Sequence, residues 1–152
     1  MKSFSEMSIA LASDHAGFAL KEKVQLFLED NGARVKDFGC FSAESCDYPD
    51  FAHPLAEAVE KGEFEFGIAI CHTGNGIAMT ANKHQGIRAA LCWDTKLAEL
   101  ARAHNNANVL CLGGRVIGVG TALELVDLFV DTSFEGGRHQ RRIDKISNIE
   151  NN

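Results

Sequence analysis

Short apolar segments alternate with amphipathic segments along most of this chain, and this alternation constrains the fold more than any other feature. Five apolar runs have the composition of buried strands, at residues 8–12, 35–38, 66–71, 87–92 and 108–112. Between them apolar residues recur at helical spacing, as at Leu20, Val24, Phe27 and Leu28. Repeated strand–helix units predict an α/β fold, with a parallel sheet covered by helices on both faces.

Residues at the expected helix ends agree with this pattern. Asn31-Gly32 is a common stop signal for a helix, and Asp94 is suited to cap the helix after the run at 87–92. The segment Thr121-Ala122-Leu123-Glu124 has the form of a capping box and predicts a helix start at Thr121. No internal repeat, low-complexity segment or linker interrupts the pattern, so residues 1–152 are predicted to form one domain.

Composition excludes several classes of protein. A net charge of −6 provides no global basic field for nucleic acid or an anionic membrane, and no apolar run approaches the ~20 residues that span a bilayer. The five cysteines are odd in number and contain no CxxC pair, which indicates reduced thiols. Residues 1–7 lack the apolar core of a signal peptide. A soluble cytoplasmic protein is expected.

Cys71 ends one apolar run and begins a glycine-rich segment, Cys71-His72-Thr73-Gly74-Asn75-Gly76. Ligands in parallel-sheet folds bind at the carboxyl ends of strands, where loops lead into helix N-termini. The two glycines allow backbone N–H groups to converge on an anion, and a thiolate there is a competent base or nucleophile. An inert, buried cysteine beside a tight turn is an equally good reading of this segment by itself.

Two known loop chemistries fit this segment poorly. A cysteine phosphatase needs an arginine six residues after its cysteine, where this chain has Ile77. A flavin-phosphate loop of the Thr-Gly-Asn type is expected after the first strand of the chain. This loop instead follows the third apolar run.

Other polar residues follow predicted strands or end helices. Asp14 and His15 follow the first strand and Arg115 follows the fifth, so all three are expected near the Cys71 loop. Tyr48 precedes the second helix and is suited either to bind substrate or to pack. His104-Asn105 ends a helix, where a histidine is often a structural cap and is otherwise available for acid–base chemistry.

The C-terminal segment carries a basic stripe. Behind Gly136-Gly137, basic residues recur at i, i+3, i+4 and i+7, namely Arg138, Arg141, Arg142 and Lys145. A helix over about 137–150 is predicted, with Ile143, Ile146 and Ile149 on another face. A solvated face is one reading, but a basic helix start behind two glycines favours phosphate binding. None of the six histidines pair at i, i+4 and no zinc-finger spacing occurs, so no metal site and no cofactor are predicted.

Taken together, these segments resemble the ribose-5-phosphate isomerase B family, within the wider group that includes galactose-6-phosphate isomerase subunits. The resemblance spans about residues 8–150. It rests on Asp14-His15-Ala16-Gly17, Asp47-Tyr48-Pro49, the Cys71–Gly76 loop, Ala81-Asn82-Lys83, Gly86-Ile87-Arg88, His104-Asn105, Asn108-Val109-Leu110 and Gly136-Gly137-Arg138-His139, in this order.

The resemblance implies a three-layer, Rossmann-like sandwich with a five-stranded parallel sheet, in a homodimer or a tetramer built from it. The implied activity is interconversion of ribose 5-phosphate and ribulose 5-phosphate through an enediolate, a step of the non-oxidative pentose phosphate pathway. By analogy, Cys71 is the base, Thr73 with the Gly74–Gly76 amides stabilises the enediolate, and His104 opens the furanose ring. The implied substrate contacts are Asp14, His15, Tyr48, His72, Gly74, Asn75, Gly76, Asn105, Arg115, Arg138 and Arg142. The family site lies at a subunit interface, so some of these residues are expected to serve the neighbouring subunit.

One residue departs from the family pattern. The position after the catalytic cysteine is usually glycine, and here it is His72, which bears on the choice of sugar. A glutamate base, used in another branch, is not available because the loop continues with Ala78 and Met79. Two alternatives remain open at this point: an isomerase of a hexose phosphate such as allose 6-phosphate, and a sugar-phosphate-binding protein without catalysis.

Overall fold

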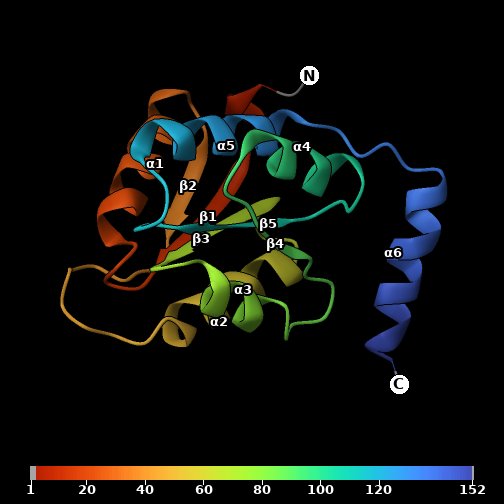
Figure 1. The fold of residues 1–152 in the computed structure, drawn as a ribbon, viewed down its shortest axis with the longest axis horizontal. Coiled ribbons are helices and arrows are strands. Elements are labelled where there is room, and N and C mark those ends of the chain that lie inside the picture. The colour runs from red at the N-terminus through yellow and green to blue at the C-terminus, as the bar shows by residue number, and fades with distance from the viewer. Residues whose placement is uncertain (1–2, 152) are drawn as a thin grey trace.

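Five parallel strands form the centre of the computed structural model, which describes residues 3–151 (Figure 1). They are β1 (Ser8–Ser13), β2 (Arg34–Asp37), β3 (Phe66–Cys71), β4 (Ala89–Leu91) and β5 (Val109–Gly113). The strand order is β2-β1-β3-β5-β4, and every neighbouring pair is parallel. The predicted α/β sandwich with a five-stranded parallel sheet is confirmed.

The helices cover both faces of this sheet. They are α1 (Phe18–Asp30), α2 (Pro49–Glu60), α3 (Asn75–Ala81), α4 (Thr95–Ala103), α5 (Val119–Asp131) and α6 (Arg138–Ile149), preceded by a short 3-10 helix, η1 (Phe4–Glu6). Helices α1, α4 and α5 lie on one face and α2 and α3 on the other, while α6 stands beside the main body at the β4 side (Figure 1). Within residues 3–151, no helix is both long and apolar enough to cross a bilayer.

Strand β3 shows why a continuous apolar run belongs in the centre of this sheet. Ile68 and Ile70 pack into the core under α1, α4 and α5, whereas Ala69 and Cys71 pack into the core under α2 and α3. Successive side chains of a strand point to opposite faces, and both faces of β3 are covered. Every residue of β3 is therefore buried, and its bounds match the predicted run.

The helix ends follow the sequence in most but not all places. Asp94 Oδ1 accepts a hydrogen bond from the Leu97 amide at 2.9 Å, so the predicted cap of α4 is confirmed. The predicted stop of α1 is also confirmed, because Asn31 is its C-cap residue. The predicted start at Thr121 is wrong. Helix α5 begins at Val119, since the Ala122 amide already donates to the Gly118 carbonyl at 3.0 Å, and Thr121 lies within the first turn.

The order of the strands reverses direction at one place. From β1 the chain moves outward to β2 on one side, and β3, β5 and β4 extend the sheet on the other side. In doubly wound sheets, ligands bind where the direction reverses, beyond the carboxyl ends of the two central strands. Here those ends are Ser13 and Cys71, so the topology selects the same edge as the sequence motifs.

Candidate active site

Three loops meet beyond the carboxyl ends of β1, β3 and β5. The Asp14 amide donates to the Ile70 carbonyl at 3.2 Å, and the Gly114 amide donates to the Cys71 carbonyl at 2.8 Å. The Arg115 amide donates to the His72 carbonyl at 3.2 Å. These backbone bonds tie the three loops to one another, so the residues they carry have a defined relative position.

Close packing at this edge requires glycine at two positions. A Cβ on Gly17 would lie 2.5 Å from the Ile70 carbonyl oxygen, and one on Gly113 would lie 2.7 Å from the Thr73 carbonyl oxygen. Both contacts are with backbone, which cannot rotate away. The glycines therefore let the loops approach closely enough to form one surface.

Cys71 lies at the centre of this surface. Its side chain is buried, with 3% of the residue exposed, and its Sγ accepts a hydrogen bond from the Gly74 amide at 3.2 Å. Gly74 has a positive φ of 89°, a conformation that favours glycine, and leads from this bond into α3. A donor suited to a thiolate is thus already in place. Thr73 Oγ1 accepts from the Asn75 amide at 3.2 Å, and both side chains are exposed beside the cysteine.

Asp14 and His15 present specific atoms to this edge. Asp14 is buried, and its Oδ1 accepts from the amides of Ala16 and Gly17 at 2.9 and 3.1 Å, which leaves Oδ2 for another donor. His15 Nδ1 accepts from the Cys46 amide at 3.2 Å. In a neutral imidazole that bond places the proton on Nε2. Asp14 therefore offers an acceptor and His15 a donor.

Tyr48 joins the same surface from the start of α2. A Cβ on Gly76 would lie 2.4 Å from Tyr48 Cζ and 2.6 Å from its hydroxyl oxygen. The ring of Tyr48 therefore lies directly against the glycine-rich loop. It remains 37% exposed, so the hydroxyl is accessible to a ligand.

The remaining site residues predicted from sequence lie at the opposite edge of the sheet. His104 is the C-cap of α4, and Asn105 follows it in the short loop that leads to the amino end of β5. Arg138 and Arg142 lie on α6, are exposed, and act electrostatically on His139, whose ring stacks on His104. A five-residue strand spans about 16 Å and separates this group from the Cys71 edge. One chain therefore does not bring Cys71 and His104 together.

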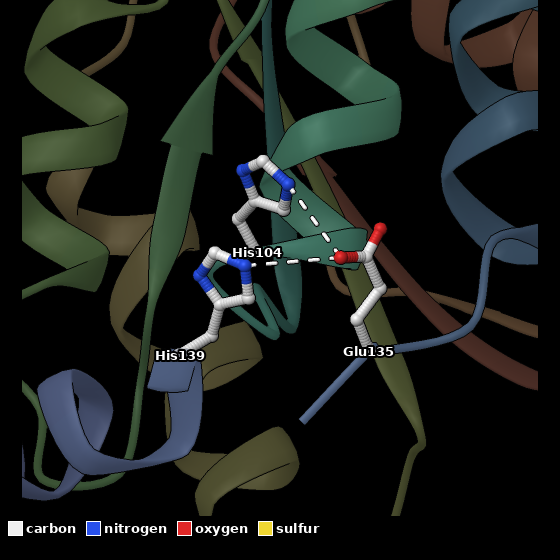
Figure 2. Close-up of side chains that lie close together, drawn as sticks. All are labelled: His104, Glu135 and His139. Atoms are coloured by element: carbon white, nitrogen blue, oxygen red, sulfur yellow. Dashed lines mark ion pairs between the residues drawn. The ribbon is translucent and has the colours of Figure 1, made fainter. Parts of the chain in front are cut away.

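Two residues of this second edge were not predicted as site residues. His139 and Glu135 lie beside His104, with both histidine Nε2 atoms facing the Glu135 carboxylate (Figure 2). Burial, and then the charge of neighbouring groups including Arg138, lowers the pKa of His139. The only sequence signal was Glu135 four residues before His139. His104, the third residue of this group, lies more than 30 positions before Glu135, a separation that spacing rules do not detect.

A cavity of about 460 Å³ lies between α6 and the β4 edge. Its lining is mostly apolar and includes Ile87, Ala90, Ile146 and Ile149, together with Asn105. Cys71 does not line it. Ile146 and Ile149 are 47% and 71% exposed, which leaves α6 with an apolar face that its own chain covers only in part.

Comparison with known proteins identifies relatives over nearly the whole chain. A profile of the Ribose/Galactose Isomerase family matches residues 9–146. Ribose-5-phosphate isomerase B of Escherichia coli is 46% identical over 142 residues, covering 93% of this chain and 95% of that protein.

Solved structures agree with the sequence relatives. Ribose-5-phosphate isomerase B of Clostridium thermocellum superimposes with a TM-score of 0.94 at 49% identity, covering 95% of this chain and 98% of that one. The enzyme of Mycoplasma genitalium, solved with bound ribulose-5-phosphate, superimposes with a TM-score of 0.93 at 45% identity, covering 96% and 97%.

Proposed function

The chain belongs to the ribose/galactose isomerase family, and we propose that it is an aldose–ketose isomerase that interconverts ribose 5-phosphate and ribulose 5-phosphate. The observation that carries this proposal is the buried Cys71 thiol at the meeting point of three loops, with an amide donor already directed at its sulfur. The M. genitalium relative was solved with ribulose-5-phosphate, the ketose of this reaction. The rest of the edge provides the groups that such a reaction needs.

Isomerisation requires a base for the C2 proton and stabilisation of the negative charge that then develops on oxygen. We assign the first role to Cys71 and the second to Thr73 with the amides of Gly74, Asn75 and Gly76. Amide donors held in place before the reaction are commonly worth about 3 kcal/mol each in the transition state. The close packing at Gly113 keeps this loop rigid, so the donors need little reorganisation.

Asp14, His15 and Tyr48 fit substrate contacts. Oδ2 of Asp14 is available to accept from a sugar hydroxyl, and the Tyr48 hydroxyl lies over the loop. His15 has its proton on the nitrogen that Cys46 does not occupy, so it is suited to donate to a phosphate oxygen. Arg115, exposed on the neighbouring loop, adds a bidentate donor for the same anion.

We further propose that the enzyme is a homodimer in which His104, Asn105, Arg138 and Arg142 serve the partner's Cys71 edge. The separation of the two groups by the length of β5 supports this arrangement, because ring opening by His104 has to occur where Cys71 acts. Exposed apolar side chains support an interface as well: Trp93 and Val116 near the Cys71 edge, and Ile146 and Ile149 on α6, are each between 47% and 71% exposed. Such patches are typical of association surfaces.

His72 is the residue that bears on sugar length. It is exposed and directly follows the base. We propose a preference for the five-carbon substrate, and turnover of ribose 5-phosphate and allose 6-phosphate should be compared in the wild type and in His72→Gly. A higher kcat/KM for the hexose phosphate in the wild type would contradict the assignment.

A cytoplasmic location is also part of the proposal. All five cysteines are free thiols, and the base itself has to stay reduced to act. An oxidising compartment would promote disulfide formation by these thiols, whereas the cytosol keeps them reduced.

The test of the reaction is ketose formation from ribose 5-phosphate by the wild type and by Cys71→Ala. We expect turnover by the wild type and a loss of about 100-fold or more in the variant. Cys92→Ala is the matched control, since Cys92 is equally buried but lies outside the site. Activity retained by Cys71→Ala would reject the base, and a wild type that binds the phosphate without turnover would reject the isomerase.

A further inference from the structure

Three potential metal ligands meet where α4 ends and α6 begins. His104 caps α4, Glu135 precedes the two glycines that lead into α6, and His139 lies in the first turn of α6. His104 Nε2 is 3.8 Å and His139 Nε2 is 3.7 Å from Glu135 Oε1. The ligand atoms of all three residues lie within 4.8 Å of one another. Figure 2 shows the Nε2 atoms of both imidazoles facing the same Glu135 carboxylate oxygen.

One of these ligand atoms has no hydrogen-bond partner among the described residues. Nε2 of His139 is buried and makes no hydrogen bond to any of the described residues, and the side chain is only 9% exposed. A buried polar atom left without a hydrogen bond carries an uncompensated desolvation cost. A group that occupied the space between His139 and Glu135 would remove that cost, so the atom points to a ligand.

The donor set defines the chemistry of that ligand. Two imidazole nitrogens and one carboxylate oxygen form a three-ligand set that zinc uses when a fourth position stays open. Ligand bonds of about 2.0–2.2 Å in a tetrahedral site place neighbouring donor atoms about 3.4 Å apart. The two distances to Glu135 exceed this by a few tenths of an ångström. Rotation of the exposed Glu135 side chain closes that difference. The two imidazole rings stack with centroids 4.1 Å apart and 13° between their planes, so they also have to rotate for both Nε2 atoms to converge on one ion.

The backbone holds the three residues in this arrangement. The Glu135 amide donates to the Ala103 carbonyl at 3.0 Å, which fixes the segment before α6 against the end of α4. The His139 amide donates to the Gly136 carbonyl at 3.2 Å. Arg138 and Arg142 on the same helix oppose a cation by charge, so the attraction for an ion has to come from the three donor atoms themselves.

We propose that His104, Glu135 and His139 form a binding site for a transition-metal dication of the zinc type, and that metal bound there inhibits the enzyme. The binding part stands on the cluster itself. The inhibitory part rests on the proposed function, in which His104 needs its imidazole for ring opening. A metal on His104 Nε2 occupies the lone pair that acid–base chemistry requires, so metal and catalysis exclude each other.

Binding is tested by titrating Zn²⁺, and Co²⁺ as its spectroscopic substitute, into untagged protein. We expect one ion per chain and at least a tenfold loss of affinity in both Glu135→Gln and His139→Gln. Glu135 is 59% exposed, so Glu135→Gln is the variant whose fold the change affects least. His53→Gln is the matched control, because His53 and His84 form a second histidine pair, with Nδ1 and Nε2 2.9 Å apart beside Glu57.

Three results would overturn the site. They are unchanged affinity in Glu135→Gln and His139→Gln, an equal loss in His53→Gln, and a sulfur-to-cobalt charge-transfer band, which would assign the ion to cysteines.

Inhibition is tested by measuring isomerase rates against free Zn²⁺, each variant being compared with its own rate without metal. The Zn²⁺ concentration for half inhibition is expected to rise at least tenfold in Glu135→Gln and to stay unchanged in His53→Gln. Equal sensitivity of the wild type and Glu135→Gln would overturn the inhibitory role. If the wild type does not turn over ribose 5-phosphate, the proposed function is wrong, and the Zn²⁺ titration still tests the metal site by itself. If the wild type turns over the substrate but does not bind Zn²⁺, the metal site is wrong and the proposed function stands.

Discussion

Mixing two inactive variants provides the strictest test of how the site is assembled. Cys71→Ala removes the proposed base at the carboxyl edge of the sheet, and His104→Gln removes the proposed ring-opening group at the amino edge. Each is expected to lower activity by about 100-fold, the lower end of what a general acid or base contributes. Because β5 separates the two edges by about 16 Å, one chain cannot supply both groups to one substrate.

The expected recovery follows from two-fold symmetry. When the two variants exchange subunits at random, about half of the dimers contain one chain of each kind. In such a dimer one site receives both altered residues, and the other receives an intact Cys71 from one chain and an intact His104 from the other. About a quarter of the wild-type activity should therefore return, roughly 25 times the activity of either variant alone if each retains about 1%.

The assay is ketose formation after the two variants have been unfolded and refolded together. Cys71→Ala mixed with Thr73→Ala is the matched control, since both residues belong to the same loop and no mixed dimer has an intact site. Native mass spectrometry verifies that subunits have exchanged. Exchange without recovery in the first mixture, or equal recovery in the control, would refute the arrangement in which each site draws on both chains.

Three further predictions concern single side chains. Gly76→Ala should lower kcat/KM by about 100-fold, because its Cβ would lie 2.4 Å from Tyr48 Cζ. Gly120→Ala is the control, since its Cβ meets open space and kcat/KM should stay unchanged; equal kcat/KM values for the two variants would contradict the contact. Lys21→Met should lower the free energy of unfolding by about 3 kcal/mol in urea titrations. It removes the fully buried ammonium, whose bonds of 2.5 and 2.6 Å to the Asp37 carboxylate and 2.8 Å to the Cys40 carbonyl are then lost; a loss below about 1 kcal/mol would show the pair to be solvated. Burial raises the pKa of Cys92 to about 11, so only about one molecule in a thousand carries the thiolate at pH 8. Alkylation of the native protein, followed by mass spectrometry, should leave Cys92 unmodified until urea is added; rapid alkylation of Cys92 in the native protein would contradict this.

The buried Lys21 illustrates an interaction that pattern analysis does not detect. In the sequence it is one of several charged residues on an amphipathic helix, a position that normally faces solvent. In the structure it is fully buried, and its ammonium group bonds Asp37 and the Cys40 carbonyl. The partners lie 16 and 19 residues away, on the far side of a turn. Only the packing of α1 against β2 brings them together.

The start of α5 shows a similar limit on a smaller scale. The Thr121–Glu124 pattern matches a capping box, yet the helix begins at Val119 behind a glycine. A capping pattern describes side chains that are able to cap. Where the first turn forms depends on which carbonyl accepts the first helical bond, and here that is the carbonyl of Gly118.

Local chemistry, read in sequence, determined the fold class and the carboxyl-edge half of the site. Apolar runs that are buried on both faces have to be central strands, and a parallel sheet necessarily gathers the residues that follow its strands at one edge. Asp14, Cys71 and Arg115 meet for that reason. The positions of His104, Glu135 and His139 were decided only by the tertiary structure. They lie at the opposite edge, where segments distant in sequence pack together, and no periodicity or motif encodes a contact between residues that share neither a strand nor a helix.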